Sequence, residues 1–229
     1  AALEAVLTHG AGELSARLVN DALRTHARLG KTPSGALLEA LGRRMVELHA
    51  AGKLGGGYAA SLVGFLGKLD ARPSQDVVAA LNAAVAEGCA RGMASANALG
   101  LAVEGWGRLG AHPGEEVWAL VERELLVAAE REEGSRFAPL APQYLVATWR
   151  GLEALGCTPS VELAAALNAR VAGSAEGLTA EGAVAVMQAW GSLGVRPGRE
   201  ALEALEALCG VLGSGGAEGE EFMAESKAA

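Results

Sequence analysis

The sequence predicts an all-α fold, an α-solenoid of about five helix-turn-helix repeats of 38–46 residues. Its composition favours helices, because 49 of the 229 residues are Ala, the best helix former, and Ile, a favoured strand residue, is absent. A Leu-Gly-x-x-Pro mark recurs along the chain, and two apolar stripes with helical spacing keep a constant distance from each mark.

The marks are five short segments that each end in proline. They read LGKTP, LDARP, LGAHP, LGCTP and LGVRP, and end at Pro33, Pro73, Pro113, Pro159 and Pro197. We expect Leu to close a helix, Gly to take the left-handed conformation after it, and Pro to prevent continuation. Asp70 stands where the other four marks have Gly.

The first helix of each unit is expected directly after the proline. The next residue is always an acceptable N-cap: Ser34, Ser74, Gly114, Ser160 or Gly198. Apolar residues follow at four, eight and twelve positions past the proline, which is one face of a helix. In the five units they are Leu37, Leu41, Met45; Val77, Leu81, Val85; Val117, Val121, Leu125; Leu163, Leu167, Val171; and Ala201, Leu205, Cys209.

The second helix is expected to begin near the residue eighteen positions before each closing proline. These residues are Ser15, Gly55, Ser95, Ala141 and Thr179. A second stripe lies ten, seven and four positions before proline, at Leu23, His26, Leu29; Val63, Leu66, Leu69; Val103, Trp106, Leu109; Trp149, Leu152, Leu155; and Met187, Trp190, Leu193. Because the three tryptophans share this stripe with Leu and Met, core packing is favoured over exposed base-stacking platforms, and Trp118 is also expected in the core.

These marks divide residues 1–213 into one repeat domain. The units are a truncated 1–33, then 34–73, 74–113, 114–159, 160–197 and a half unit 198–213. About six extra residues near REEGSRFAP predict a longer loop, and residues 214–229 predict an acidic flexible tail. One helix pair cannot bury both of its faces, so we expect neighbouring pairs to stack; a helical bundle is the competing architecture.

The charge of −8 argues against a strongly basic nucleic-acid binder. Residues 1–110 carry a net +2 and residues 111–229 a net −10. The three cysteines are far apart, which favours a reducing compartment, and no apolar stretch is long enough to predict membrane insertion.

No motif for catalysis or cofactor binding is present in the sequence. We therefore expect a protein that is not an enzyme, with no cofactor, metal site or small-molecule substrate. The segment LGGGY (54–58) resembles a phosphate-binding loop only in composition, because it lacks the GxxxxGK[ST] pattern and follows a helix; it predicts the turn between two helices.

Four segments resemble the second helix of octotricopeptide repeats, whose pattern is L-x-x-x-L/W-A-L-x-x-L-G-x-x-P. They are LSARLVNDALRTHARLGKTP, NALGLAVEGWGRLGAHP, QYLVATWRGLEALGCTP and GAVAVMQAWGSLGVRP, and the resemblance covers about residues 14–205. The resemblance implies an organellar RNA-binding protein of the kind abundant in green algae, some of which belong to organellar ribosomes. Tetratricopeptide, pentatricopeptide and HEAT-like arrays remain alternatives.

Candidate RNA-binding residues lie in columns of the first helices, because repeat proteins read RNA with side chains at equivalent positions. Asn82 and Asn168 stand nine positions after proline, and an Asn amide can bond a base edge in two directions; alternatively they are solvated or bond a neighbouring turn. Arg43, Arg44, Arg123 and Arg170 occupy the next two columns, where they would follow phosphates or form an exposed face of mixed charge.

The function expected from the resemblance is non-catalytic binding of rRNA or organellar mRNA, as an accessory component of a mitochondrial or chloroplast ribosome. The expected localisation is the soluble matrix or stroma, with ribosomal or other organellar proteins as partners. The alternative is a protein-binding scaffold or assembly subunit of another organellar complex, favoured by the net negative charge and the small number of units.

Overall fold

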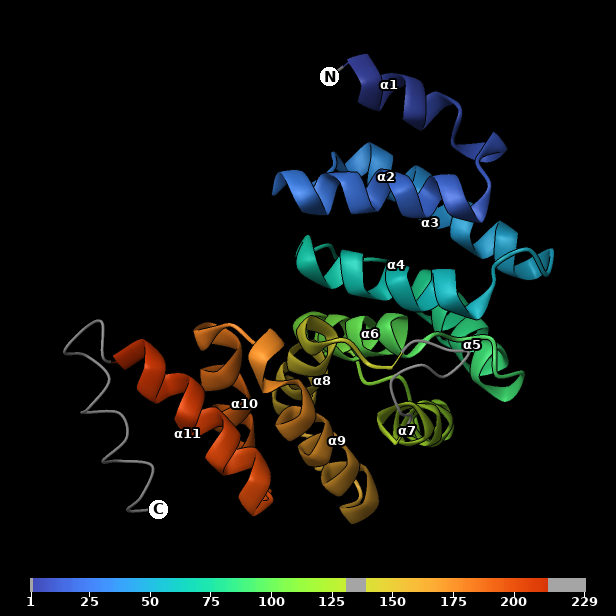
Figure 1. Ribbon diagram of the computed structural model, residues 1–229. Helices are drawn as coiled ribbons and strands as arrows, with labels where there is room; N and C mark the ends of the chain where they lie inside the picture. The colour runs from blue at the N-terminus through green and yellow to red at the C-terminus, as the bar shows by residue number, and fades with distance from the viewer. Residues whose placement is uncertain (1, 131–138, 214–229) are drawn as a thin grey trace.

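The part of the chain that the structure describes is all-helical (Figure 1). A computed structural model describes residues 2–130 and 139–213, and within these ranges it contains eleven α-helices, two short 3-10 helices and no strand. The all-α prediction is therefore confirmed for the described residues. The longer loop expected near REEGSRFAP falls on residues 131–138 and the expected acidic tail on residues 214–229, and both lie outside the described residues.

The α-helices alternate along the chain between the two kinds that the sequence predicts. They are α1 (Ala2–His9), α2 (Ala16–Leu29), α3 (Gly35–Ala50), α4 (Gly56–Lys68), α5 (Gln75–Ala90), α6 (Ala96–Leu109), α7 (Glu115–Ala129), α8 (Pro142–Leu155), α9 (Val161–Ser174), α10 (Ala180–Leu193) and α11 (Arg199–Gly213). The 3-10 helices are η1 (Ala11–Glu13) and η2 (Ala175–Gly177).

The Leu-Gly-x-x-Pro marks end helices as predicted. A left-handed glycine follows four of the even-numbered helices, at Gly30, Gly110, Gly156 and Gly194. Asp70 takes the same conformation after α4, with φ 48°, although it carries a β-carbon. The five predicted starts of the second helices are also N-caps, and the side chains of Ser15, Ser95 and Thr179 accept a hydrogen bond from the first turn.

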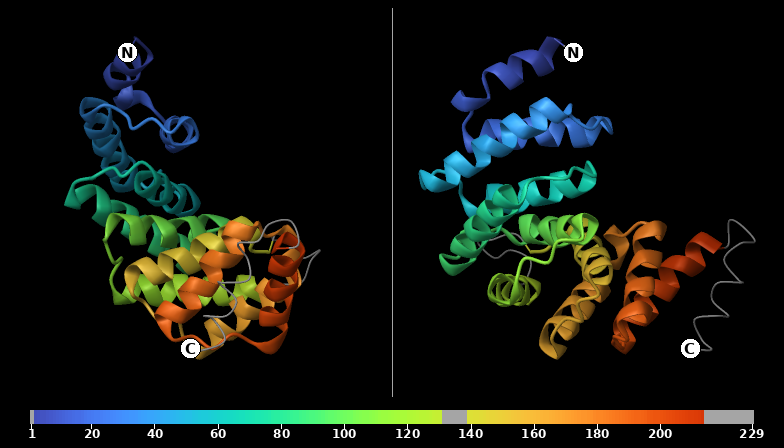
Figure 2. Two further views of the ribbon diagram at one scale, coloured as in Figure 1. Left: turned by 90° about the vertical axis from the view of Figure 1, so that its left-hand side faces the viewer. Right: turned by 180° about the vertical axis from the view of Figure 1, so that it is seen from behind.

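The helices pack in two rows. The odd-numbered helices form one row, in which each contacts the next from α1 to α11, and the even-numbered helices form a second row from α2 to α10. The rows follow an arc that opens to the left in Figure 1, and Figure 2 shows the same stacking from two other sides. Along the bend, α4, α6 and α8 lie on the inner side, and α5 and α7 lie on the outer side.

The inner helices approach one another through glycine. A β-carbon on Gly105 of α6 would lie 2.5 Å from the carbonyl oxygen of Val63 and 2.7 Å from the Cα of Gly64, both in α4. A β-carbon on Gly151 of α8 would lie 2.4 Å from the carbonyl of Val103 in α6. Since only glycine allows such close approach, the inner row is packed more tightly than the outer row, which bends the array.

A continuous apolar core fills the space between the two rows. The two stripes supply most of it, and all four tryptophans are buried as predicted: Trp106, Trp118, Trp149 and Trp190. Leu29 is an exception among the stripe residues, because its exposed fraction is 64%. It lies in the last turn of α2, the first even-numbered helix, which has a row neighbour on one side only among the described residues.

Candidate nucleic-acid interface

The side chains of the two candidate asparagines form hydrogen bonds within the protein. The Nδ2 of Asn82 in α5 donates to the carbonyl of Pro113 at 3.4 Å, and its Oδ1 accepts from Nε1 of Trp106 in α6 at 3.0 Å. Asn168 holds the same position in α9, and its Nδ2 donates to the carbonyl of Arg196 at 3.4 Å. Both side chains thus bond the neighbouring turn, which is one of the arrangements that the sequence left open.

The second asparagine differs from the first in one bond. Asn168 Oδ1 and Trp190 Nε1 are both buried without a partner, and they correspond to the two atoms that bond between Asn82 and Trp106. Trp190 packs edge-on against Trp149, with ring centroids 6.2 Å apart. The side chains of Asn82 and Trp106 are therefore hydrogen-bonded to each other, whereas those of Asn168 and Trp190 are not.

Glutamates use the same column to hold the turns. Glu122 stands nine positions after Pro113, and its Oε1 accepts from the backbone N–H of Ser160 at 2.7 Å. No proline mark stands before Glu4 of α1 in this sequence, but its side chain makes the corresponding bond, because its Oε1 accepts from the backbone N–H of Ser34 at 3.2 Å. This column therefore ties each of these odd-numbered helices to the Leu-Gly-x-x-Pro turn that follows it, through asparagine or glutamate.

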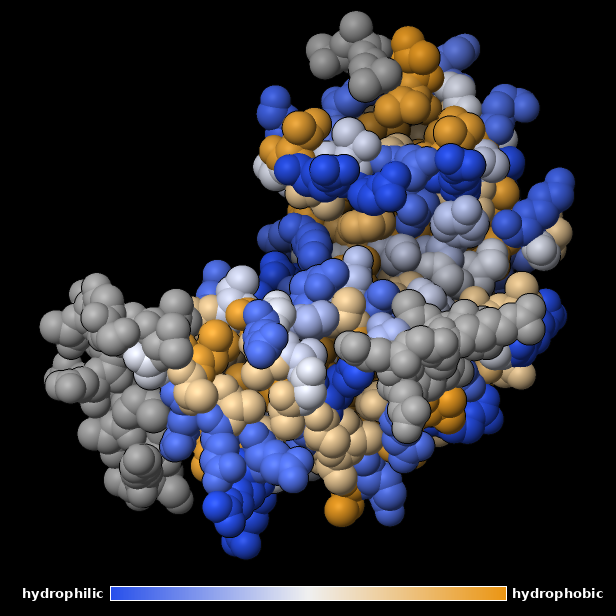
Figure 3. All heavy atoms as spheres, in the orientation of Figure 1, coloured by the Kyte–Doolittle hydropathy of each residue, from blue (hydrophilic) through white to orange (hydrophobic). Residues whose placement is uncertain are grey.

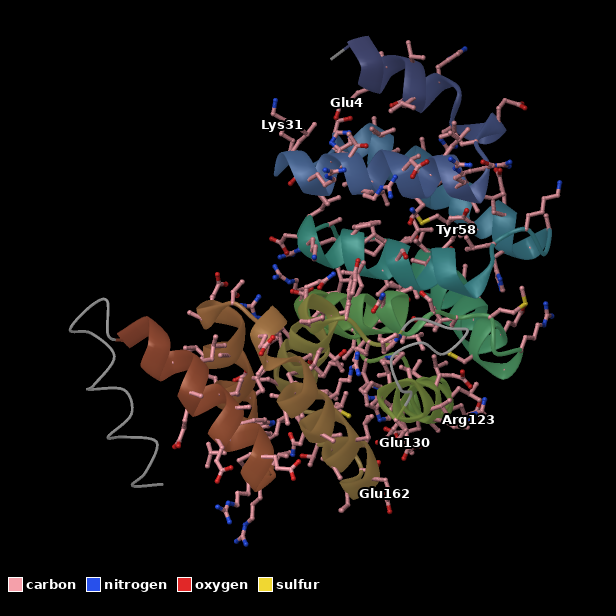
Figure 4. All side chains as sticks on the ribbon, in the orientation of Figure 1. Glu4, Lys31, Tyr58, Arg123, Glu130 and Glu162 are labelled. Carbon is pink, nitrogen blue, oxygen red and sulfur yellow. The ribbon has the colours of Figure 1, made fainter. Side chains whose placement is uncertain are left out.

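Three of the four candidate arginines donate to backbone carbonyls of the preceding unit. Arg44 Nε donates to Leu14 O at 2.7 Å, and Arg170 Nε donates to Leu140 O at 3.3 Å; both carbonyls lie just before the N-cap of an even-numbered helix. Arg123, labelled in Figure 4, donates through Nη2 to Cys89 O at 3.4 Å and to Glu124 at 3.3 Å. These guanidinium groups join each of the three helices to the unit before it, at the loop before an even-numbered helix for Arg44 and Arg170 and at the last turn of α5 for Arg123.

Arg43 has a different setting from the other candidates. It is exposed on α3 and borders a groove of about 720 Å³ between α3 and α5. The six candidate residues thus lie on four odd-numbered helices, and their side-chain bonds place most of them against turns and loops. Their contact with RNA stays a prediction.

The even-numbered helices carry a column of basic residues that the sequence did not lead us to predict. Arg28, Lys68 and Arg108 each stand five positions before a closing proline, in the last turns of α2, α4 and α6, and all three are exposed. The same spacing argument that identified the asparagines would have found this column, had it been applied to the second helix. Because equivalent positions of stacked helices face the same way, the three charges lie along one edge of the array.

Further charges gather at this edge, which we call the turn edge and define as Arg28, Lys31, Lys68, Arg72 and Arg108. Thr32 Oγ1 donates to Leu69 O at 3.3 Å, so the turn after α2 lies against the end of α4. Figure 3 shows hydrophilic side chains over α2 and at the left-hand end of α4, and Figure 4 shows Lys31 on the same side.

Carboxylates offset part of this charge. Glu104 is 5% exposed and lies 2.9 Å from Arg108 and 3.7 Å from Lys68, so it holds two members of the turn edge in place. Asp70 is exposed in the same turn as Arg72, and Glu4 lies near Lys31 in Figure 4. Five cations therefore face three carboxylates, one of which is buried beneath the surface.

All three cysteine thiols have a raised pKa. Burial raises the pKa of the Cys89 thiol to about 11, with Glu124 adding to the effect and Arg123 opposing it. Burial also raises the pKa of Cys157 and Cys209. Within residues 2–130 and 139–213, no group of three or more His, Cys, Asp or Glu side chains is placed to hold a metal ion, and none of the described helices is long and apolar enough to cross a membrane.

No protein-family model matches the chain, and no curated protein matches it either.

Proposed function

We propose that this protein is a non-catalytic α-solenoid that binds the phosphate backbone of RNA along its turn edge. The observation that carries the proposal is the column of Arg28, Lys68 and Arg108, exposed at the same end of three successive helices. Backbone binding of this kind needs aligned cations rather than a base-reading pocket.

The solenoid interpretation rests on the sequence marks together with the two rows. Five marks keep a constant phase to two apolar stripes, and each helix contacts the next helix of its own row. A closed bundle would instead bring distant helices together around one centre. An open array of stacked pairs offers a continuous edge on which one side chain per unit can follow an extended strand.

The spacing of the column suits a nucleic-acid strand. Packed helices lie about 8–10 Å apart, so the three column cations repeat at a distance that a single strand can follow with one or two phosphates per step. Lys31 and Arg72 in the turns add charge between these positions. The side chains of Asn82 and Asn168 bond the turns themselves, so we assign the turn edge to phosphate and assign no base reading to the asparagines.

The setting that we propose follows from the resemblance to octotricopeptide repeats. It would place the protein in a mitochondrion or chloroplast, as an accessory component of the ribosome that contacts rRNA, with organellar mRNA as the other RNA partner. The net −10 of residues 111–229 fits a protein that touches RNA with one half and ribosomal proteins with the other.

The test compares charge reversals at the turn edge with one elsewhere on α2. The triple variant Arg28→Glu, Lys31→Glu, Arg72→Glu removes exposed cations that hold no other element, and we expect it to abolish binding to a single-stranded organellar RNA at low salt. Reversing fewer charges should instead flatten the salt dependence, by about 0.7 in the slope of log K against log salt for each phosphate that the protein no longer neutralises. Arg17→Glu is the control, because it lies about 16 Å away along α2 and its side chain is 77% exposed.

The proposal fails if the unchanged protein shows no RNA association at low salt, alone or in its native complex. It also fails if the triple variant binds as the control does. Ribosomal placement is tested separately, by sedimentation of a tagged protein: we expect it to travel with ribosomal particles, and sedimentation alone or with a membrane complex would exclude that placement.

A second candidate function is a protein-binding scaffold, for which the outer groove between α3 and α5 is the specific observation. Its floor is apolar, with Leu38, Val46 and Val77, and its rim carries Arg43 and Asp76. Because Arg72 also lines this groove, the double variant Arg28→Glu, Lys31→Glu separates the two functions: if it still joins its particle while its RNA affinity falls, protein contacts of this kind hold it there.

A further inference from the structure

The column of side chains that holds the turns is interrupted in α3. Asn82, Glu122 and Asn168 stand nine positions after a proline mark, and each of them bonds the turn that follows its helix pair. Gly42 holds this position in α3, and a glycine has no side chain with which to bond. The turn between α4 and α5, residues 70–74, is therefore not held from α3 by this column.

Ser74, at the end of this turn, lacks the bonds of its counterparts. Ser34 and Ser160 also follow a proline mark; the N–H of each donates to a glutamate of the preceding odd-numbered helix, and the hydroxyl of each caps its own helix. Ser74 is exposed, and its side chain makes no cap hydrogen bond. Among the described residues, its N–H has no acceptor either. Two donors of one residue are thus free for a ligand.

The groove between α3 and α5 gives a ligand access to these donors. It has a volume of about 720 Å³, and both Gly42 and Ser74 line it. Leu38, Val46 and Val77 provide its apolar floor. The volume lies in the range of ordinary ligand sites, and apolar groups gain free energy by leaving water there. A ligand that fits this groove combines apolar groups with one acceptor that reaches Ser74.

The spacing of the floor suits an extended chain. Leu38 and Val46 lie four residues before and after Gly42, which is about 6 Å along the axis of α3 in each direction. In an extended segment, the side chains of one face recur every two residues, or about 6.6 Å. A segment with the pattern apolar-x-Glu-x-apolar can therefore place its carboxylate opposite Gly42 and an apolar side chain on the floor at either side.

The rim provides charge for a carboxylate. Arg43 and Arg72 are exposed at the groove, and neither forms an ion pair or a side-chain hydrogen bond with a described residue. Arg43 follows Gly42, and Arg72 lies in the same turn as Ser74, so each wall of the groove has an unpaired cation near the free donors. Three carboxylates border the groove and oppose an anion, of which the last is already paired with Arg44: Glu39, Asp76 and Glu47.

We propose that this groove binds an extended segment of a partner protein with the pattern apolar-x-Glu-x-apolar. The glutamate accepts from the N–H and the hydroxyl of Ser74, as Glu122 accepts from the N–H of Ser160, and Arg43 and Arg72 neutralise its charge. The proposal deepens the protein-binding candidate function, on which it rests, by naming the chemistry of the partner. It does not depend on RNA binding.

The probe is the peptide acetyl-Ser-Leu-Ser-Glu-Ser-Leu-Ser-amide, added to the full chain while the amide signals of Gly42 and Ser74 are followed by NMR. The comparison peptides carry Gln or Lys in place of Glu. We expect saturable shifts with the Glu peptide, about tenfold weaker binding of the Gln peptide because its hydrogen bonds are uncharged, and no shift with the Lys peptide. This comparison changes only the peptide, so it is independent of how any variant folds.

The decisive variant is Gly42→Glu, which restores the column. Its carboxylate should bond Ser74 and so exclude the peptide. A β-carbon at Gly42 would lie 3.0 Å from Val77 Cγ2, so the valine must move slightly; Gly42→Ala adds the same β-carbon without a carboxylate and is the matched control. We expect Gly42→Ala to bind the peptide and Gly42→Glu not to bind it, with the higher midpoint of thermal unfolding for Gly42→Glu. The exposed change Arg43→Glu should weaken binding independently.

The proposal is wrong if the Glu peptide moves neither signal, if the Gln peptide binds as tightly, or if Gly42→Glu binds as well as Gly42→Ala. It is also wrong if the groove is already held by this chain. Sedimentation equilibrium would then show a dimer that Gly42→Glu dissociates, or the double change Glu220→Gln, Glu221→Gln would move the Ser74 signal of the free protein.

The variants of the two proposals are separate. Arg28→Glu with Lys31→Glu changes the turn edge outside the groove, so this double variant should bind the peptide as the unchanged protein does. Gly42→Glu leaves the turn edge intact and should keep its RNA affinity. Either proposal can therefore fail while the other holds.

Discussion

The close contact between α4 and α6 predicts an unusual response to a single methyl group. In Gly105→Ala the new β-carbon would lie 2.5 Å from the carbonyl oxygen of Val63 and 2.7 Å from the Cα of Gly64. Ordinary van der Waals contact begins near 3.4 Å, so the first of these pairs is 0.9 Å too close. Because both partners are backbone atoms, no side-chain rotation can relieve the overlap, and the two helices must move apart.

The cost follows from two opposing effects. Overpacking a tight interface costs about 1–3 kcal/mol, and the upper end applies where backbone meets backbone. Alanine is favoured over glycine within a helix by about 1 kcal/mol. We therefore expect Gly105→Ala to lower the free energy of unfolding by about 2 kcal/mol, or the midpoint of thermal unfolding by about 4–8 °C for a chain of this size.

Urea and thermal unfolding followed by circular dichroism measure this change. Gly191→Ala in α10 is the matched control, because it is the same substitution within a helix and its β-carbon meets nothing within 4 Å. We expect the control to be as stable as the unchanged protein or more stable, by up to about 1 kcal/mol. The reasoning is refuted if Gly105→Ala is as stable as Gly191→Ala.

Two further predictions concern buried polar groups. Asn82→Ala leaves Trp106 Nε1 without its acceptor, so we expect the free energy of unfolding measured in urea to fall by about 1–3 kcal/mol. The fall should be smaller for Asn168→Ala, because Asn168 Oδ1 has no partner to lose. If these variants instead lower the affinity for RNA and leave the stability unchanged, the asparagines recognise bases. The raised pKa of Cys89 keeps its thiol protonated at neutral pH, and the thiolate forms only as the pH rises toward about 11. Mass spectrometry should therefore find Cys89 unmodified by iodoacetamide at pH 8 in the folded protein and modified in urea, and rapid modification of the folded protein would contradict this environment.

Local signals in the sequence determine where the helices lie. Gly30 and Gly110 adopt the left-handed conformation after their helices, which glycine does easily because it has no β-carbon. The proline three residues later prevents the helix from continuing, and both effects are independent of the rest of the chain. Serine and threonine caps act within one turn, which is why the helix starts could be read directly. Trp106, Trp149 and Trp190 share the phase of an apolar stripe, so their burial also followed from periodicity.

Contacts between units depend on the tertiary structure, because they join residues about 30 to 40 positions apart. The sequence placed Asn82 and Arg44 in columns, but it left open whether their side chains face solvent, RNA or protein. In the structure Asn82 donates to the carbonyl of Pro113, and Arg44 donates to the carbonyl of Leu14. In the same way, Gly42 is only a position within a helix in the sequence, and packing placed it in one groove with Ser74.

The sequence by itself determined the all-helical character, the ends of the helices and the buried tryptophans, because each follows from interactions within a turn or along one helix face. The tertiary structure alone decided which row lies on the inner side of the bend and which polar side chains hold the turns. Those outcomes depend on how closely the backbones of two helices approach, as at Gly105 and Val63. Such a distance depends on how both helices pack together, so the sequence of one helix alone does not determine it.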